Sequence, residues 1–125
     1  MPTPVSGIGQ IAITVSDVDR ALAFYRDILE LEFLFRPSPN LAFLAVGDTR
    51  LMLTTPQGAG SVGHNSILYF KVAQIESAFT TLLDRGATSE RKPVATAELS
   101  DHTLWLGFLC DPDGNLVGLM EERRR

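Results

Sequence analysis

The sequence is poor in the features that mark secreted and membrane proteins. It has one cysteine, Cys110, in 125 residues, so no disulfide can form within the chain, as is typical of a reducing compartment. No apolar run approaches the ~18 residues of a membrane-spanning helix. The start, MPTPVSGIGQ, has neither the basic nor the apolar region of a signal peptide. We therefore expect a cytoplasmic protein that does not contact a membrane.

Positive charge is also scarce. The chain has 11 lysines and arginines against 15 aspartates and glutamates, and its formal net charge is −4. This balance excludes a general attraction to nucleic acid or anionic lipid. We interpret the one basic run, Arg123-Arg124-Arg125, as a solvated and frayed C-terminus rather than a binding patch.

The remaining composition is that of an ordinary globular protein. Hydrophobic residues make up 45% and charged residues 21% of the sequence, which gives no sign of disorder. A chain of this length has room for a real core. We expect residues 1–125 to form a single domain.

One order of predicted strands and helices occurs twice along the chain. Alternating or β-branched runs predict strands, 3.6-residue apolar stripes predict helices, and Gly, Pro and Asp clusters predict the turns. An offset of 57 residues aligns Ile11 with Leu68 and Val15 with Val72, so each half reads as a strand, a helix and three strands. The predicted strands are 8–15, 32–37, 41–47 and 49–55, then 66–72, a shorter one near 88–94, 102–110 and 115–120; the predicted helices are 18–29 and 75–86.

The stretch LCDPDGNLVGLM, residues 109–120, predicts a hairpin near the C-terminus. Pro112 presets its backbone, Asp111 and Asp113 can bond neighbouring backbone groups, and Gly114 and Asn115 tolerate a positive φ. Two of the predicted strands should therefore pair around this turn.

With "VSDVDRALAFYRDIL" early and "DPDGN" late, the chain resembles the vicinal oxygen chelate superfamily, which includes glyoxalase I, bleomycin-resistance proteins and extradiol dioxygenases. The resemblance covers about residues 7–121. It implies an α+β fold of tandem βαβββ modules, whose curved mixed sheets form a cup around a ligand, and a homodimer. Module one would span about 7–56, a linker about 56–65, and module two about 66–121.

Metal enzymes of this superfamily hold a divalent ion on four strand positions. The resemblance places these positions on Gln10, Met52, Ile67 and Gly118. Only the Gln10 amide is a suitable donor for a hard or borderline cation, because Met52 offers a soft thioether and the other two offer nothing. We therefore expect a degenerate site that holds no metal, and no cofactor.

Alternation along the predicted strands selects the residues that line the cup. The candidate ligand-binding residues are Gln10, Met52, Tyr69, Phe108 and Met120. His102, beside Asp101, is the candidate catalytic residue, while Trp105 faces the other way unless a bulge turns it. Each has an alternative: the polar groups can serve a closed core, the methionines can fill gaps in it, and a histidine at the start of a strand can simply face solvent.

Two further side chains have a plainer interpretation. Cys110 abuts Asp111, whose charge opposes a thiolate, so we expect a packed or edge thiol rather than a nucleophile. His64 lies in the glycine-rich linker, where we expect it to be exposed.

Three functions remain open at this point. The first is metal-independent binding of a small organic molecule in an apolar cup, for sequestration or weak acid/base chemistry through His102. The second is a divalent-metal-dependent lyase, isomerase or dioxygenase whose ligands lie at positions other than these four, or which draws on His64 and His102. The third is a structural or interaction domain without a ligand. The sequence identifies neither the ligand nor any reaction.

Overall fold

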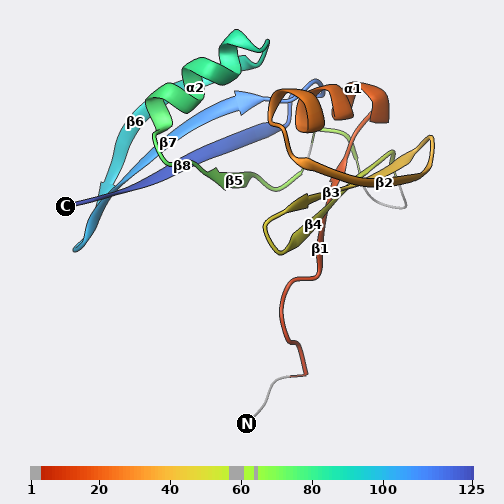
Figure 1. The fold of residues 1–125 in the computed structure, drawn as a ribbon, viewed down its shortest axis with the longest axis horizontal. Coiled ribbons are helices and arrows are strands. Elements are labelled where there is room, and N and C mark those ends of the chain that lie inside the picture. The colour runs from red at the N-terminus through yellow and green to blue at the C-terminus, as the bar shows by residue number, and fades with distance from the viewer. Residues whose placement is uncertain (1–3, 57–60, 64) are drawn as a thin grey trace. The chain divides into compact units, whose positions relative to one another are not determined.

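The computed structural model describes residues 4–56, 61–63 and 65–125, which divide into two compact units with their boundary between Val62 and Gly63 (Figure 1). This boundary lies inside the predicted linker. Residues 57–60 and His64, on which part of the linker prediction rests, lie outside the described residues.

The first unit is one βαβββ module. Its four-stranded sheet has the order β1-β4-β3-β2, in which β1 runs parallel to β4 and the other pairs are antiparallel. The helix between the first two strands begins as an α-helix and continues as a π-helix, η1. The elements are β1 (Gln10–Thr14), α1 (Val18–Leu22), η1 (Ala23–Ile28), β2 (Glu32–Ser38), β3 (Leu41–Val46) and β4 (Thr49–Thr54).

The helix of this unit begins where the sequence predicts. The side chain of Asp17 caps it by accepting a hydrogen bond from the backbone N–H of Arg20 at 3.2 Å. Phe24 is buried beside Tyr25, although it lies off the apolar stripe of 3.6-residue period, which comprises Val18, Ala21, Leu22, Tyr25, Ile28 and Leu29. The π-helical turn explains this, because its wider hydrogen-bonded ring, from Leu29 N–H to the Phe24 carbonyl, shifts the phase of the stripe.

The second unit repeats the module, as Figure 1 shows. Its sheet has the order β5-β8-β7-β6, with β5 parallel to β8 and the other pairs antiparallel. The elements are β5 (Leu68–Lys71), α2 (Ile75–Asp84), β6 (Thr88–Glu98), β7 (His102–Cys110) and β8 (Leu116–Arg124). The α+β prediction of tandem βαβββ modules is confirmed.

The prediction of a shorter strand near 88–94 is wrong. β6 has 11 residues and follows β7 along its whole length despite Pro93. Three register shifts make this possible: between Ser89 and Arg91, between Arg91 and Val94, and between Ala95 and Ala97. Such bulges accommodate a proline and extra residues at a sheet edge.

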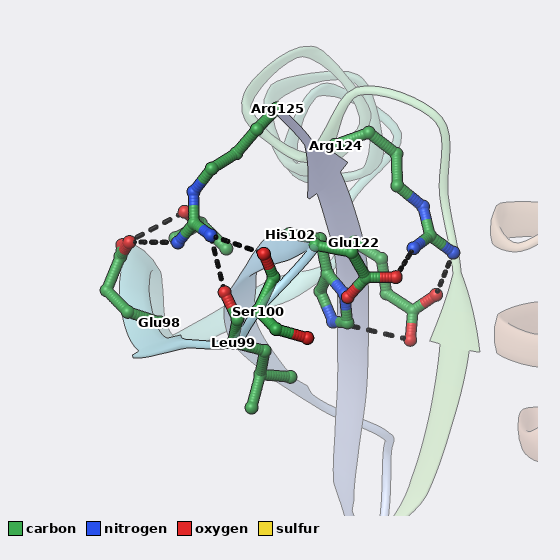
Figure 2. A network of polar contacts seen from close by, with 9 residues as sticks. Glu98, Leu99, Ser100, His102, Glu122, Arg124 and Arg125 are labelled. Atoms are coloured by element: carbon green, nitrogen blue, oxygen red, sulfur yellow. Dashed lines mark hydrogen bonds and ion pairs between the residues drawn. The ribbon is translucent and has the colours of Figure 1, made fainter.

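The prediction that the basic run at the C-terminus frays is also wrong. β8 extends to Arg124, which pairs with His102 of β7. The Arg124 guanidinium also binds the carboxylate of Asp101, and Arg125 donates to Glu98 at 2.5 Å (Figure 2). Carboxylates near the turn between β6 and β7 thus hold the basic residues in place.

Each sheet has one face against its helix and one face opposite to it, which we call the open face. The helix-side residues are the buried ones, for example Leu51 and Leu53 in the first unit and Leu109, Val117 and Leu119 in the second. Because side chains alternate along strands, the open faces carry Gln10, Phe43 and Met52 in the first unit, and Tyr69, Phe108, Gly118 and Met120 in the second.

Glu121 ties the helix of the second unit to its sheet. Its carboxylate accepts a hydrogen bond from the backbone N–H of Ile75, the first residue of α2, at 2.9 Å, and another from Arg123 at 2.9 Å. These two bonds, the one from Arg123 first, lower the pKa of the Glu121 carboxyl. The carboxylate therefore stays ionised and caps the helix at neutral pH.

The predicted hairpin turn joins β7 to β8. Asp111, which is 5% exposed, accepts hydrogen bonds through Oδ1 from the backbone N–H groups of Asp113 and Asn115 at 2.9 and 2.8 Å. Its Oδ2 accepts from the Asn115 side-chain amide at 2.8 Å. Gly114 alone in this turn has a positive φ, 80°, so the turn needs one left-handed residue where the sequence offers two.

Within the part of the chain that the structure describes, neither helical segment is long and apolar enough to cross a membrane.

Candidate functional site

The two open faces are built on the same register. Ala12 of β1 pairs with Met52 of β4, and Tyr69 of β5 pairs with Gly118 of β8, so the 57-residue offset found in the sequence (69 − 12) also relates the two sheets. On the next strand, Phe43 pairs with Met52 and Phe108 pairs with Gly118. Met52 and Gly118 are therefore equivalent positions, and each has a phenylalanine beside it.

On the first unit the structure brings Gln10 and Met52 together. The Gln10 amide Nε2 lies 3.5 Å from the Met52 sulfur, as expected for neighbouring strands of one face. The Gln10 Oε1 accepts a hydrogen bond from Nε of Arg50 at 3.0 Å. Sequence reasoning missed Arg50, although it lies two residues before Met52 and so faces the same way on the strand.

An aromatic pair completes the open face of the first unit. The Arg50 guanidinium lies 5.2 Å from the centre of the Phe43 ring, and Phe35 of β2 stacks on Phe43 with ring centres 4.7 Å apart. Guanidinium and ring attract each other at this distance. Sequence reasoning missed both phenylalanines, because the site residues of the first unit were taken from β1 and β4 alone.

On the second unit the Tyr69 ring lies directly over Gly118. A Cβ at position 118 would lie 2.6 Å from Cδ2 of that ring, closer than real Cβ atoms approach another atom. Tyr69 also meets Phe108 edge to face, with ring centres 5.8 Å apart. The final strand therefore carries glycine here because the tyrosine ring of the neighbouring strand occupies the space of a side chain.

A cavity of about 220 Å³ adjoins this aromatic pair within the second unit. The Arg91 guanidinium lies 5.7 Å from the centre of the Phe108 ring. Glu90 and Arg91 were missed from the sequence, where β6 was expected to be a shorter strand and no site residue was taken from it. The lining residues are Ile67, Glu90, Arg91, Phe108 and Leu116.

Cys110 is a half-buried thiol close to the residues of this cavity. Its sulfur donates to Oε2 of Glu90 at 3.6 Å. Burial, then the bond to Glu90 and its negative charge, raise the pKa of the Cys110 thiol above its usual value. The group therefore stays protonated at neutral pH and is a poor nucleophile, in line with the sequence prediction.

His102 lies apart from the cavity. It is 8% exposed, with Nδ1 2.8 Å from Oδ1 of Asp101 and Nε2 3.7 Å from Oε2 of Glu122 (Figure 2). The bond to His102 is the main cause that lowers the pKa of Asp101. Phe108 lies six positions after His102 on the same strand, about 20 Å away at the usual rise of a strand. Within the second unit, the structure therefore does not bring the candidate catalytic residue to Phe108.

The two remaining candidates fall on opposite faces of the second sheet. Met120 is half-buried and pairs with Leu106 of β7 and Lys71 of β5 on the open face. Trp105 lies on the helix side, where Arg123 sits 4.3 Å from the centre of its ring. No bulge interrupts the pairing of β7 with β8, so strict alternation holds for Trp105.

The residues at the four positions that the family resemblance assigns to a metal are poor donors for a divalent ion. The one suitable donor, the Gln10 oxygen, already accepts from the Arg50 cation, whose charge opposes a second cation nearby. Ile67 has no donor, and Gly118 is covered by Tyr69. Across residues 4–56, 61–63 and 65–125, no three histidine, cysteine, aspartate or glutamate side chains are grouped so as to hold a metal; His64 lies outside these ranges.

The double βαβββ architecture defines the class of protein. The profile of the Glyoxalase/Bleomycin resistance protein/Dioxygenase superfamily matches residues 7–119. The chain belongs to this superfamily, as its sequence resemblance predicted.

Solved structures of other proteins have the same fold. The chain is similar to lactoylglutathione lyase from Agrobacterium tumefaciens (24% identity, TM-score 0.77, 95% of this chain and 96% of that one). It is also similar to a member of the Glyoxalase/bleomycin resistance protein/dioxygenase superfamily from Sphaerobacter thermophilus (26% identity, TM-score 0.72, 94% of this chain and 98% of that one). A third similar structure is a virulence protein from Salmonella typhimurium (21% identity, TM-score 0.78, 96% of this chain and 99% of that one). No curated protein matches the chain.

Proposed function

We propose that the protein binds a small organic molecule on its open sheet faces without a metal ion. The observation that carries this proposal is the bond between Arg50 and Gln10. It puts a fixed positive charge beside Gln10, the one suitable metal donor among the four positions that the family resemblance assigns. A guanidinium over an aromatic ring is a surface that binds organic ligands, and it disfavours a cation.

The residues around the other ligand positions support the same function. Tyr69 and Phe108 present aromatic surface, and the adjoining cavity combines apolar walls with two charged groups. Mostly apolar linings with a few polar groups are typical of small-molecule sites. A metal-dependent lyase or dioxygenase would need donors that these positions lack.

Sequestration is the activity that this arrangement supports best. The acid/base candidate from the sequence, His102, would have to lie within hydrogen-bond reach of a ligand held beside Phe108, yet it lies about 20 Å away along its strand. His102 instead bonds to Asp101 in the turn before β7 and lies near the carboxylate of Glu122 on β8. The homodimer and the cytoplasmic location stay predictions.

Binding should survive removal of metal. We expect small aromatic compounds, screened by ligand-observed NMR, to bind the protein equally before and after dialysis against EDTA. Tyr69→Ala should weaken binding several-fold, because it removes half of the aromatic surface beside the cavity. Leu99→Ala, which truncates an exposed side chain at the turn before β7, is the matched control. Loss of binding on EDTA treatment and its return with added Zn²⁺ or Ni²⁺ would favour a metal enzyme instead.

A further inference from the structure

We propose that the cavity of the second unit selects small monocarboxylic acids that carry a hydrogen-bond donor at the other end. The inference rests on the proposed function and names the class of ligand. Arg91 would bind the carboxylate, Phe108 and Ile67 would contact the apolar body, and Glu90 would accept from a hydroxyl or amine.

Arg91 differs from the arginines at the other end of this unit. Arg123, Arg124 and Arg125 each form ion pairs with carboxylates. The Arg91 side chain makes no hydrogen bond or ion pair with any residue that the structure describes; its contact is with the Phe108 ring. Its donors therefore remain available at the edge of a cavity, and the planar guanidinium matches a carboxylate with two parallel hydrogen bonds.

A bulge in β6 brings two neighbouring residues to one cavity. Consecutive residues of a regular strand face opposite sides, yet Glu90 and Arg91 both line the cavity. The register shift between Ser89 and Arg91 makes Glu90 the extra residue, which a bulge re-aims. The outcome is an acceptor and a cation side by side at one site.

Glu90 and Arg91 do not neutralise each other. The structure gives no ion pair between them, and the Glu90 carboxylate accepts instead from the Cys110 thiol at 3.6 Å. Each charge is therefore available to a separate group of a ligand. A carboxylate facing Arg91 is favoured, and a second carboxylate facing Glu90 is repelled.

The size of the cavity limits the apolar body. Its volume of about 220 Å³ is below the usual range of roughly 300–1,000 Å³ for ligand pockets. Ile67, Phe108 and Leu116 supply the apolar walls. A single ring or a short branched chain, with polar groups at its ends, matches this space and these walls.

Three probes test the charge pattern by isothermal titration: 4-hydroxybenzoate, neutral benzyl alcohol and dianionic terephthalate. We expect 4-hydroxybenzoate to bind the wild type most tightly. Arg91→Gln should weaken its binding at least ~10-fold, since a charge-assisted bidentate contact is lost. Lys92→Gln removes the same charge from the next residue, which is exposed, and should leave binding unchanged. Glu90→Gln should strengthen terephthalate relative to 4-hydroxybenzoate.

The outcomes separate the two proposals. If the wild type binds benzyl alcohol as tightly as 4-hydroxybenzoate, the ligand class is wrong while the binding function stands. The same holds if Arg91→Gln and Lys92→Gln weaken the binding of 4-hydroxybenzoate equally. If none of the three probes binds, the ligand class is wrong, and the broader screen of aromatic compounds then decides the binding function. Arg91→Lys keeps the charge without the planar fork and should fall between wild type and Arg91→Gln. Unchanged thermal melting shows that the variants are folded.

Discussion

Asp111→Ala is expected to lower the free energy of unfolding by about 3 kcal/mol, because hydrogen bonds to a buried carboxylate are strong and its donors would be left unsatisfied. The carboxylate accepts three hydrogen bonds from Asp113 and Asn115. Alanine offers no side-chain acceptor in place of the carboxylate, so the change should loosen the connection between β7 and β8. Urea denaturation, followed by circular dichroism, measures the loss.

Two further variants test whether the loss of stability comes from the hydrogen bonds of Asp111. Asp111→Asn keeps an oxygen for the backbone N–H groups, but it sets an NH₂ group against the side-chain amide of Asn115, so its loss should be intermediate. Asp48→Ala changes the same residue type in the turn between β3 and β4, where the side chain is exposed, and should cost little. Equal losses for Asp111→Ala and Asp48→Ala would contradict the importance of the Asp111 bonds.

Gly118→Ala should also destabilise the protein, by about 1–3 kcal/mol, the usual cost of overpacking. The new Cβ would overlap the Tyr69 ring, which must swing away and lose its contact with Phe108. A carboxylate introduced by Gly118→Glu would displace the same ring, so one substitution does not restore a metal ligand here.

A double-mutant cycle tests the packing of Tyr69 on Gly118. In a Tyr69→Ala background, Gly118→Ala should be nearly neutral, because the ring that it would strike is gone. Gly9→Ala, where a Cβ would meet nothing within 4 Å, is the control for the general effect of replacing glycine. If Gly118→Ala costs the same with and without Tyr69, the ring does not determine the need for glycine.

The fold could be predicted because local signals agree with one another. The Asp17 cap, the apolar stripe that follows it and the turn from Asp111 to Asn115 each act over a few residues. The 57-residue repeat then showed that the module occurs twice. Such consistency between local preference and global fold is what makes a topology readable from sequence.

The wrong predictions concern segments whose structure depends on residues that are distant in the sequence. The basic run at the C-terminus is ordered by Glu98 and Asp101, which precede it by more than 20 positions and reach it only through the pairing of β7 with β8. The bulges of β6 likewise depend on the length of its partner strand. Neither effect leaves a local trace in the sequence.

The candidate site was predicted in part. Alternation placed Gln10 with Met52 and Tyr69 with Phe108, and the structure brings each of these pairs together. The arginines were missed, because exposed charges on strands usually belong to a solvated face. His102 was placed on the correct strand, but alternation along a strand predicts only which face a side chain lies on. It does not predict the distance between His102 and Phe108.

The central claim is that the protein works without a bound metal, and equilibrium dialysis tests it most directly. Wild type and Gln10→Ala would be dialysed against Zn²⁺, Ni²⁺, Mn²⁺ and Fe²⁺ in turn, and the metal per chain measured by mass spectrometry. We predict far less than one equivalent for both proteins, because one amide already bonded to Arg50 cannot hold a divalent ion. One equivalent in the wild type, lost in Gln10→Ala, would contradict this account.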